Sequence, residues 1–425
     1  MPFRQKNTSR SFNSKPGKKG LYYGWIIVGA LFLIGMAGLG IARFSFGVFF
    51  ESLQDNFGWS RASTSGVFSA YMFFSLLVTI LGGWAVDRYG PRKVFTALGF
   101  FTGLGLLLTS RVTAPWHLFL TYSLLLAMGT GCTYVASMTT IFRWFKERRG
   151  LALGIVSCGA GIGMMVMSPI AAYFISSYGW QTSYSIMALM AFLIMIPCAL
   201  LLRNPPGEAA ALADGGGLEN RTRELPLAQA AKTRNFWLQL FILFLFSTCI
   251  FSVTTHIVPH AHDLGIGSMP AALLLSYIGG GSILGRIILG RISDSIGRKQ
   301  AFLICALLLM GTMLWLTESS DLWMLYICTA VFGFSFGGTA PANAALIGEY
   351  FGARHLGLIM AVIDIGWQAG AALGSILTGH TFDISGGYVP AFRAGAIVAL
   401  IAAILILFLR TPSQHHARNV SYTKR

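Results

Sequence analysis

The sequence predicts an all-α integral membrane protein with twelve transmembrane helices in two pseudo-symmetric halves of six. Composition, a series of apolar segments and an internal repeat support this prediction. Hydrophobic residues make up 55% of the 425 residues and charged residues 11%, whereas a soluble domain contains about 25% charged residues. Each helix that spans a bilayer needs roughly 20 apolar residues, so a chain of this length has room for about a dozen.

Apolar segments follow one another in two groups of six. A polar linker at 203–234 separates the groups and contains Pro205, Pro206 and three glycines at 215–217, a composition that predicts a flexible connection. We expect one six-helix bundle at 21–202 and a second at 235–410, with polar tails at 1–20 and 411–425. The segments lie at about 24–49, 62–85, 94–110, 115–141, 150–175, 181–202, 236–258, 270–290, 300–317, 322–348, 356–380 and 389–409.

The basic residues lie mainly in the tails and in alternate loops. When both termini are placed on one side, all but five of the 31 lysines and arginines fall on that side, and such an excess marks the cytoplasmic face. Short loops and a polar N-terminal tail in place of a signal peptide favour a bacterial inner membrane. The net charge of +16 is therefore explained by topology, without a nucleic-acid partner. The five exceptions are Arg43, Arg61, Arg111, Arg286 and Arg393.

The second half of the chain repeats features of the first. A constant spacing of 207 positions (290 − 83 = 207) separates Gly83 and Gly290, Asp87 and Asp294, Gly90 and Gly297, Gly150 and Gly357, and Gly179 and Gly386. A spacing shared by such distant positions predicts two halves of similar fold. Halves of this kind pack around a central substrate cavity near the middle of the bilayer.

The loop at 83–93 (GWAVDRYGPRK) resembles the signature loop of the major facilitator superfamily. The weaker copy in the second half has Ser295 where the first has an arginine. The resemblance implies the major facilitator fold and a gating loop. A carboxylate here also suits a helix N-terminus, although these charges have membrane orientation as a simpler role. The residues assigned to the gating loop are Gly83, Asp87, Arg88, Gly90, Arg92 and Asp294.

A second stretch at 144–154 (WFKERRGLALG), followed by Gly159-Ala160-Gly161, is similar to the conserved helix-5 stretch of monocarboxylate transporters. The opening Tyr23-Gly24-Trp25 also resembles that family and the oxalate:formate antiporters. Together these resemblances imply a carboxylate carrier. Helix packing is the alternative explanation for the small residues.

Arg286 is the principal candidate for substrate binding. It lies in the apolar segment at 270–290 among several glycines, and a charge at this depth is functional by default. A guanidinium binds a carboxylate through two parallel hydrogen bonds. The resembling families place a substrate-binding arginine in the corresponding helix. The alternative is a structural ion pair with Asp364 or Glu349.

Titratable residues gather near the end of the segment at 236–258. His256 and Asp263 are candidates for proton coupling, His256 also for substrate binding, and Pro259 between them predicts a kink. His260 and His262 are weaker candidates, since a surface loop is an equally good explanation for them and for Asp263. We expect protonation of Asp263 or His256 to release Arg286 for substrate.

Four further residues in apolar segments complete the candidate site. Arg43 either attracts anions to the cavity or extends to the membrane surface, and Asp364 either pairs with Arg286 or carries a proton. Ile363-Asp364 stands where the oxalate:formate group has a second cation, which favours a monocarboxylate. Tyr134 and Asn343 are candidates for hydrogen bonds to substrate, or to a neighbouring helix.

These features predict a secondary active transporter that moves a small monocarboxylate of the L-lactate or pyruvate class together with a proton, by alternating access. The proton offsets the cost of moving a monoanion against the membrane potential, about 2.3 kcal/mol per 100 mV. An anion exchanger of the oxalate:formate type, a carrier of another organic anion and a receptor on the same scaffold are alternatives. We expect the protein to contact membrane lipids and to function as a monomer, because one chain contains both halves. We expect no enzymatic activity, no cofactor and no metal.

Overall fold

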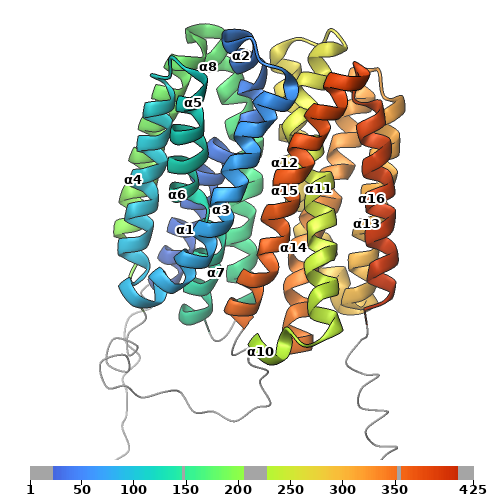
Figure 1. The fold of residues 1–425 in the computed structure, drawn as a ribbon. Helices are drawn as coiled ribbons and strands as arrows, with labels where there is room; N and C mark the ends of the chain where they lie inside the picture. Colours follow the sequence, from blue (N-terminus) through green and yellow to red (C-terminus); the bar gives the residue numbers. More distant parts are fainter. Residues whose placement is uncertain (1–22, 146–148, 205–226, 352–355, 410–425) are drawn as a thin grey trace, which may run out of the picture.

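The structure of this chain is a computed structural model, and it describes residues 23–145, 149–204, 227–351 and 356–409. Long helices run side by side in two groups (Figure 1). We call the end of the molecule at which α10 lies the α10 end, and the end at which α2 lies the α2 end. The described part contains 11 helical stretches that are long and apolar enough to cross a membrane.

The first group of helices is built from α1 to α8. The expected first helix is divided by a π-helical turn, η1, and continues through α2 to Phe57, where Gly58 adopts a left-handed conformation (φ 63°). Its elements are α1 (Tyr23–Leu39), η1 (Gly40–Phe44), α2 (Phe46–Phe57), α3 (Arg61–Tyr89), α4 (Pro91–Thr109), α5 (Pro115–Leu118), η2 (Phe119–Leu125), α6 (Leu126–Thr130), α7 (Thr133–Trp144) and α8 (Arg149–Leu200).

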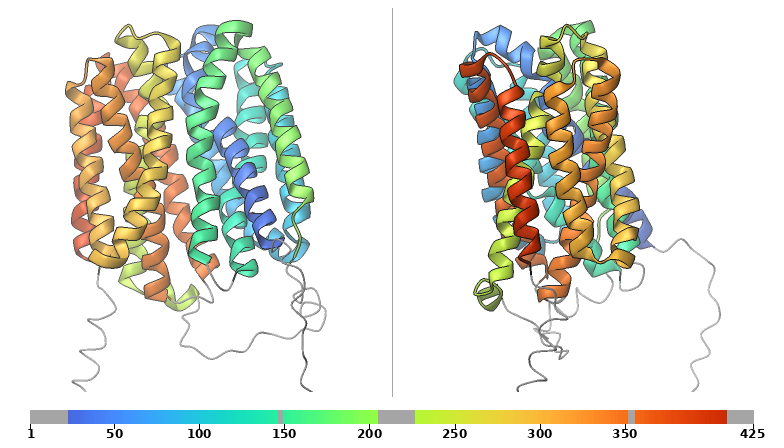
Figure 2. Two further views of the ribbon diagram at one scale, coloured as in Figure 1. Left: turned by 180° about the vertical axis from the view of Figure 1, so that it is seen from behind. Right: turned by 90° about the vertical axis from the view of Figure 1, so that its right-hand side faces the viewer.

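The long element α8 consists of two helices. A straight helix of its 52 residues would extend about 78 Å, more than twice the roughly 30 Å thickness of a bilayer core. Gly179 interrupts it with φ 78° and ψ 164°, a conformation that is strained for a residue with a side chain. Here the chain turns back at the α2 end (Figure 2). The break expected between 175 and 181 is therefore confirmed.

The second group is built from six helices after the short α10. The interruption between α15 and α16 contains Gly386 with φ 70°, at the position that repeats Gly179. Likewise Gly90 (φ 79°) and Gly297 (φ 96°) share a left-handed φ, so the repeated glycines occupy equivalent backbone turns. The elements are α10 (Leu227–Ala230), α11 (Arg234–Asp263), α12 (Ser268–Ile296), α13 (Arg298–Glu318), α14 (Leu322–Phe351), α15 (Leu356–Ser385) and α16 (Val389–Leu407).

Two helix pairs make the most extensive contacts between the groups. The backbones of α8 and α12 approach closely, since a Cβ atom on Gly279 would lie 2.6 Å from the carbonyl oxygen of Gly161. Helix α3 contacts α15, and the Ser69 hydroxyl donates a hydrogen bond of 2.7 Å to the Ala372 carbonyl. Large apolar side chains such as Leu81 and Leu193, 64% and 65% exposed, cover the outside, as expected of a surface that faces lipid.

Candidate functional site

A cavity lies between the two groups of helices, and most of its lining is apolar. Its walls come from α1, η1, α6, α7, α8, α11, α12, α14 and α15. Among the lining residues, four side chains carry charge or titrate: Arg43, Tyr134, Arg286 and Asp364. The structure therefore brings together four candidates that are distant in the sequence.

Arg286 extends from α12 into this cavity. One guanidinium nitrogen donates a hydrogen bond to the backbone carbonyl of Ser157 on α8, and the group lies over the ring of Phe336 at 5.9 Å. Its Nε atom is buried and has no hydrogen-bond partner within the described part of the chain. A buried donor left unpaired costs about 1–3 kcal/mol, so this arginine is suited to an anionic ligand.

The acidic partners considered for Arg286 bind other groups. Glu349 forms an ion pair with Arg298 near the α10 end, with 3.0 Å between Oε1 and Nε. Asp364 accepts a hydrogen bond of 3.3 Å from the amide of Gln368, one helical turn further along α15. Arg286 is therefore not held by either carboxylate in this conformation.

Arg43 lies at the cavity and not at the membrane surface. Its guanidinium donates to Gln368 Oε1 at 2.9 Å and to Met72 Sδ at 3.1 Å, and it lies 5.0 Å from the ring centre of Phe251. Through Gln368, Arg43 of the first group is linked to Asp364 of the second. Sequence reasoning missed Gln368, since a neutral amide in an apolar segment carries no distinctive signal.

Tyr134 and Asn343 line the same cavity. Tyr134 lies within electrostatic range of both Arg286 and Asp364. Asn343 is 8% exposed, and its Oδ1 atom lacks a hydrogen-bond partner among the described residues. Both side chains are placed to bond a small polar ligand in this cavity.

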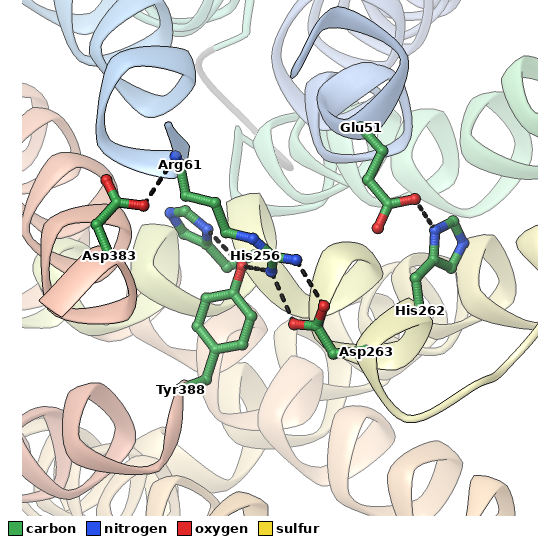
Figure 3. A network of polar contacts seen from close by, with 7 residues as sticks. All are labelled: Glu51, Arg61, His256, His262, Asp263, Asp383 and Tyr388. Atoms are coloured by element: carbon green, nitrogen blue, oxygen red, sulfur yellow. Dashed lines mark hydrogen bonds and ion pairs between the residues drawn. The ribbon is translucent and has the colours of Figure 1, made fainter. Parts of the chain in front are cut away.

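His256 and Asp263 lie in a separate polar cluster at the α2 end (Figure 3). Arg61 of α3 pairs with Asp263 through two contacts, Nη2–Oδ1 at 2.6 Å and Nη1–Oδ2 at 2.8 Å. Arg61 also donates to the Tyr388 hydroxyl. Asp383 accepts the backbone N–H groups of Arg61 at 3.0 Å and of its neighbour at 2.8 Å, where a carboxylate favours the start of α3.

His256 is fully buried in this cluster. Its Nε2 atom lies 3.1 Å from the Ser65 hydroxyl and 2.9 Å from the Ser375 carbonyl, and its Nδ1 atom lies 3.3 Å from the Tyr388 hydroxyl. Burial raises the pKa of Tyr388 well above its ordinary value, so this hydroxyl stays protonated.

The other two histidines belong to the same end of the molecule. His262 pairs with Glu51 of α2 (Figure 3), and His260 packs against the rings of Tyr388 and Phe392. Neither histidine lines the cavity. The sequence had placed Arg61 among the outer cations. The bonding partners of its guanidinium belong to the second half of the chain, so they could not be recognised from the sequence around Arg61.

The sequence profile of the Major Facilitator Superfamily matches this chain at residues 31–300 and 261–423. The chain belongs to this superfamily. A bacterial homolog of the human lysosomal transporter Spinster, solved in an inward-facing and unoccupied conformation, superposes with a TM-score of 0.71 over 93% of this chain and 97% of its own. At 16% identity this likeness supports the fold alone.

Several relatives are named monocarboxylate transporters. Monocarboxylate transporter 13 of Bos taurus is 26% identical over 395 residues, which cover 90% of this chain and 89% of that protein. Its Rattus norvegicus counterpart is 28% identical over 90% and 88%. An uncharacterized MFS-type transporter of Escherichia coli K12 is 25% identical over 68% and 72%. This superfamily member therefore resembles the monocarboxylate transporters.

The superfamily loop lies between α3 and α4, at the α10 end. Gly90 supplies its left-handed turn, and the exposed Arg88 lies over the ring of Trp84 at 5.5 Å. Arg92 is exposed in the first turn of α4. The side chains of Asp87 and Asp294 and the surroundings of Gly83 are outside what the structure describes. The gating role of these residues therefore stays a prediction.

The two ends of this superfamily member differ in how its halves meet. At the α2 end, Arg61 and Asp263 bond across the halves. The cavity lining instead continues toward the α10 end, where it includes Phe142 of α7 and Met360 of α15. The conformation is thus closed at the α2 end.

Proposed function

We propose that this protein is a transporter that moves a small monocarboxylate anion together with a proton by alternating access. It crosses a bacterial inner membrane twelve times as a monomer, with α8 counted as two spans and with both termini and the α10 end in the cytoplasm. The excess of basic residues on that side supports the orientation. The single observation that favours an anionic substrate is the convergence of Arg43 and Arg286 on one largely apolar cavity.

Charge balance favours coupling to a proton. When Asp364 is ionised, the cavity contains two positive groups and one negative group. Binding one monoanion and one proton leaves this sum unchanged, so the loaded and empty carriers cross the same electrical barrier. The substrate carboxylate would occupy the free side of Arg286, with Tyr134 and Asn343 as further hydrogen-bond partners.

Asp364 is better placed than Asp263 or His256 to carry the proton. It lies in the cavity itself, whereas Asp263 is bonded to Arg61 and His256 is enclosed by α3 and α15 at the α2 end. The latter two would then respond to opening of that end, as members of a gate. A proton on Asp364 strengthens the attraction of the cavity for an anion, because it removes the nearby negative charge.

One observation favours a second candidate, exchange of small dicarboxylates. The sequence points to Arg286 as the main central cation and so favours a monoanion. In the structure, however, the guanidinium groups of Arg43 and Arg286 both line this cavity. Two carboxylates of one substrate could each bind one arginine. Such a carrier would catalyse counterflow without proton movement.

The deciding experiment measures uptake of labelled L-lactate into proteoliposomes with and without an inward proton gradient, for wild type and Arg286→Ala. We expect uptake that the gradient stimulates and that the substitution abolishes. Oxalate counterflow in the absence of gradient-driven L-lactate uptake would instead support the exchanger. Arg291→Ala, at an exposed position near the end of α12, is the matched control for loss of a positive charge.

A further inference from the structure

Gln368 connects the two kinds of charge in the cavity. Its side chain is 3% exposed, and both ends of its amide are used. The oxygen accepts from Arg43 Nη2 at 2.9 Å, and the nitrogen donates to Asp364 Oδ2 at 3.3 Å. Because Arg43 belongs to η1 and Asp364 to α15, this one amide joins an anion-binding group of the first half to an acid of the second.

The orientation of this amide depends on the state of the acid. An ionised carboxylate only accepts hydrogen bonds, so it holds the NH₂ group of Gln368 and leaves the amide oxygen for Arg43. A protonated carboxyl has an O–H donor, which is satisfied by the amide oxygen. The amide would then turn over and present its NH₂ group to Arg43, and two donors cannot bond one another.

We propose that Gln368 is a positioning residue that transmits protonation of Asp364 to Arg43 by reversing its amide. With Asp364 ionised, the amide oxygen of Gln368 holds the guanidinium of Arg43 against the second half. With Asp364 protonated, the reversed amide releases Arg43, whose guanidinium turns to a substrate carboxylate. The inference rests on the proposed function and specifies how its proton and anion sites communicate.

The surroundings of Asp364 leave Gln368 as its hydrogen-bonded link to Arg43. The titratable groups that face the acid from neighbouring elements are Arg43 of η1, Tyr134 of α7 and Arg286 of α12, with Tyr71 of α3 beyond Arg43. Among the described residues, the lining of α11 and α14 has no titratable side chain. Protonation of Asp364 is therefore the step that changes the net charge around Arg43.

The test measures the Kd of purified, full-length protein for L-lactate at pH 5.5 and pH 7.5. For wild type we expect binding roughly tenfold tighter at the lower pH, within the usual range of coupling between sites. Asp364→Asn should bind with the same Kd at both. Gln368→Met, which retains the shape but neither hydrogen bond, should still bind L-lactate but reduce the pH effect to less than about twofold.

A second variant and a control complete the test. Gln368→Leu also removes both hydrogen bonds without adding a titratable group, and it should likewise reduce the pH effect to less than about twofold, even if the methionine variant does not fold. Gln239→Met changes another buried amide, on α11, outside the cavity lining, and should keep the full pH effect of wild type.

Two failures are distinguishable. If wild type does not bind L-lactate at either pH, the proposed function and this inference are both rejected. If Asp364→Asn keeps the pH effect, another group carries the proton and the inference is rejected while proton-coupled transport stands. If wild type and Asp364→Asn behave as expected while Gln368→Met and Gln368→Leu each keep the wild-type pH effect, the inference alone is overturned. A merely structural role of Gln368 would change the Kd equally at both pH values.

Discussion

Arg61 and Asp263 form a bidentate ion pair between the two halves of the protein, although 202 positions separate them in the sequence. The guanidinium lies over the ring of Phe382 at 3.9 Å and is 9% exposed, against 35% for the carboxylate. Planar paired contacts of this kind are among the stronger polar interactions in proteins. Opening of the α2 end requires that this pair separate, so its strength helps to set the balance between conformations.

The first prediction concerns the conformational balance. Asp263→Asn removes the charge of the acceptor, and hydrogen bonds to charged groups contribute about 1.5–3 kcal/mol. We expect the population open at the α2 end to rise roughly tenfold to hundredfold. The measurement is labelling of a Thr255→Cys reporter, buried on α11, by a membrane-impermeant maleimide in a background without the native cysteines.

Asp55→Asn provides the matched control for this prediction. Asp55 is an exposed carboxylate of α2 at the same end, so its substitution removes an equal charge without touching the pair. Labelling that rises equally in both variants would show that net charge, and not the bond to Arg61, governs opening.

The second prediction concerns pH. Burial raises the pKa of Tyr388 above its ordinary value, which is about 10, so the hydroxyl remains neutral from about pH 5 to pH 9. Tyr388→Phe removes an acceptor of Arg61 and should increase labelling of the same reporter by a factor that is constant over that range. A factor that changes as pH rises toward 9 would mean that Tyr388 ionises in this range.

The third prediction tests the geometry of the anion site. Arg286→Lys keeps a positive charge but loses the planar fork that binds a carboxylate through two bonds. We expect the initial rate of L-lactate uptake to fall about tenfold to hundredfold. Arg291→Lys, on the same helix but exposed near its end, should transport at the wild-type rate. Equal rates for the two variants would contradict a bidentate role of Arg286.

Features that depend on position along one helix were predictable from the sequence. The apolar segments located the long helices, and the repeat predicted two similar halves, in which Gly90, Gly179, Gly297 and Gly386 all have positive φ at backbone turns. Arg286 and Arg43 were found because charges in apolar segments are costly and therefore rare. Such signals are local, since each needs only the residue and its flanking sequence.

Features that depend on which helices are neighbours were not predictable. Arg61 and Tyr388 are 327 positions apart, and Arg43 and Gln368 are 325 apart, yet each pair is bonded. Hydrophobic periodicity identifies the buried face of a helix, but it does not identify the partner of that face. The expectation that protonation of Asp263 or His256 releases Arg286 stays a prediction, and it did not include Arg61, whose guanidinium is paired with Asp263 at the α2 end.

The fourth prediction concerns the contact between α8 and α12. A Cβ atom on Gly279 would lie 2.6 Å from the carbonyl oxygen of Gly161 and 2.7 Å from the backbone nitrogen of Met165, whereas one on Gly280 would first meet a flexible side-chain sulfur at 3.9 Å. Gly279→Ala must therefore separate two backbones, at a cost of about 1–3 kcal/mol. Gly280→Ala should be neutral or stabilising, because alanine favours a helix by about 1 kcal/mol over glycine.

These adjacent substitutions add the same methyl group to the same helix, so their difference isolates the inter-half contact. We expect Gly279→Ala to lower the thermal unfolding midpoint of the purified protein and to slow L-lactate uptake, while Gly280→Ala does neither. Equal midpoints and equal uptake would show that α8 and α12 separate at little cost. The remaining contacts between the halves, among them that between α3 and α15, would then hold them together.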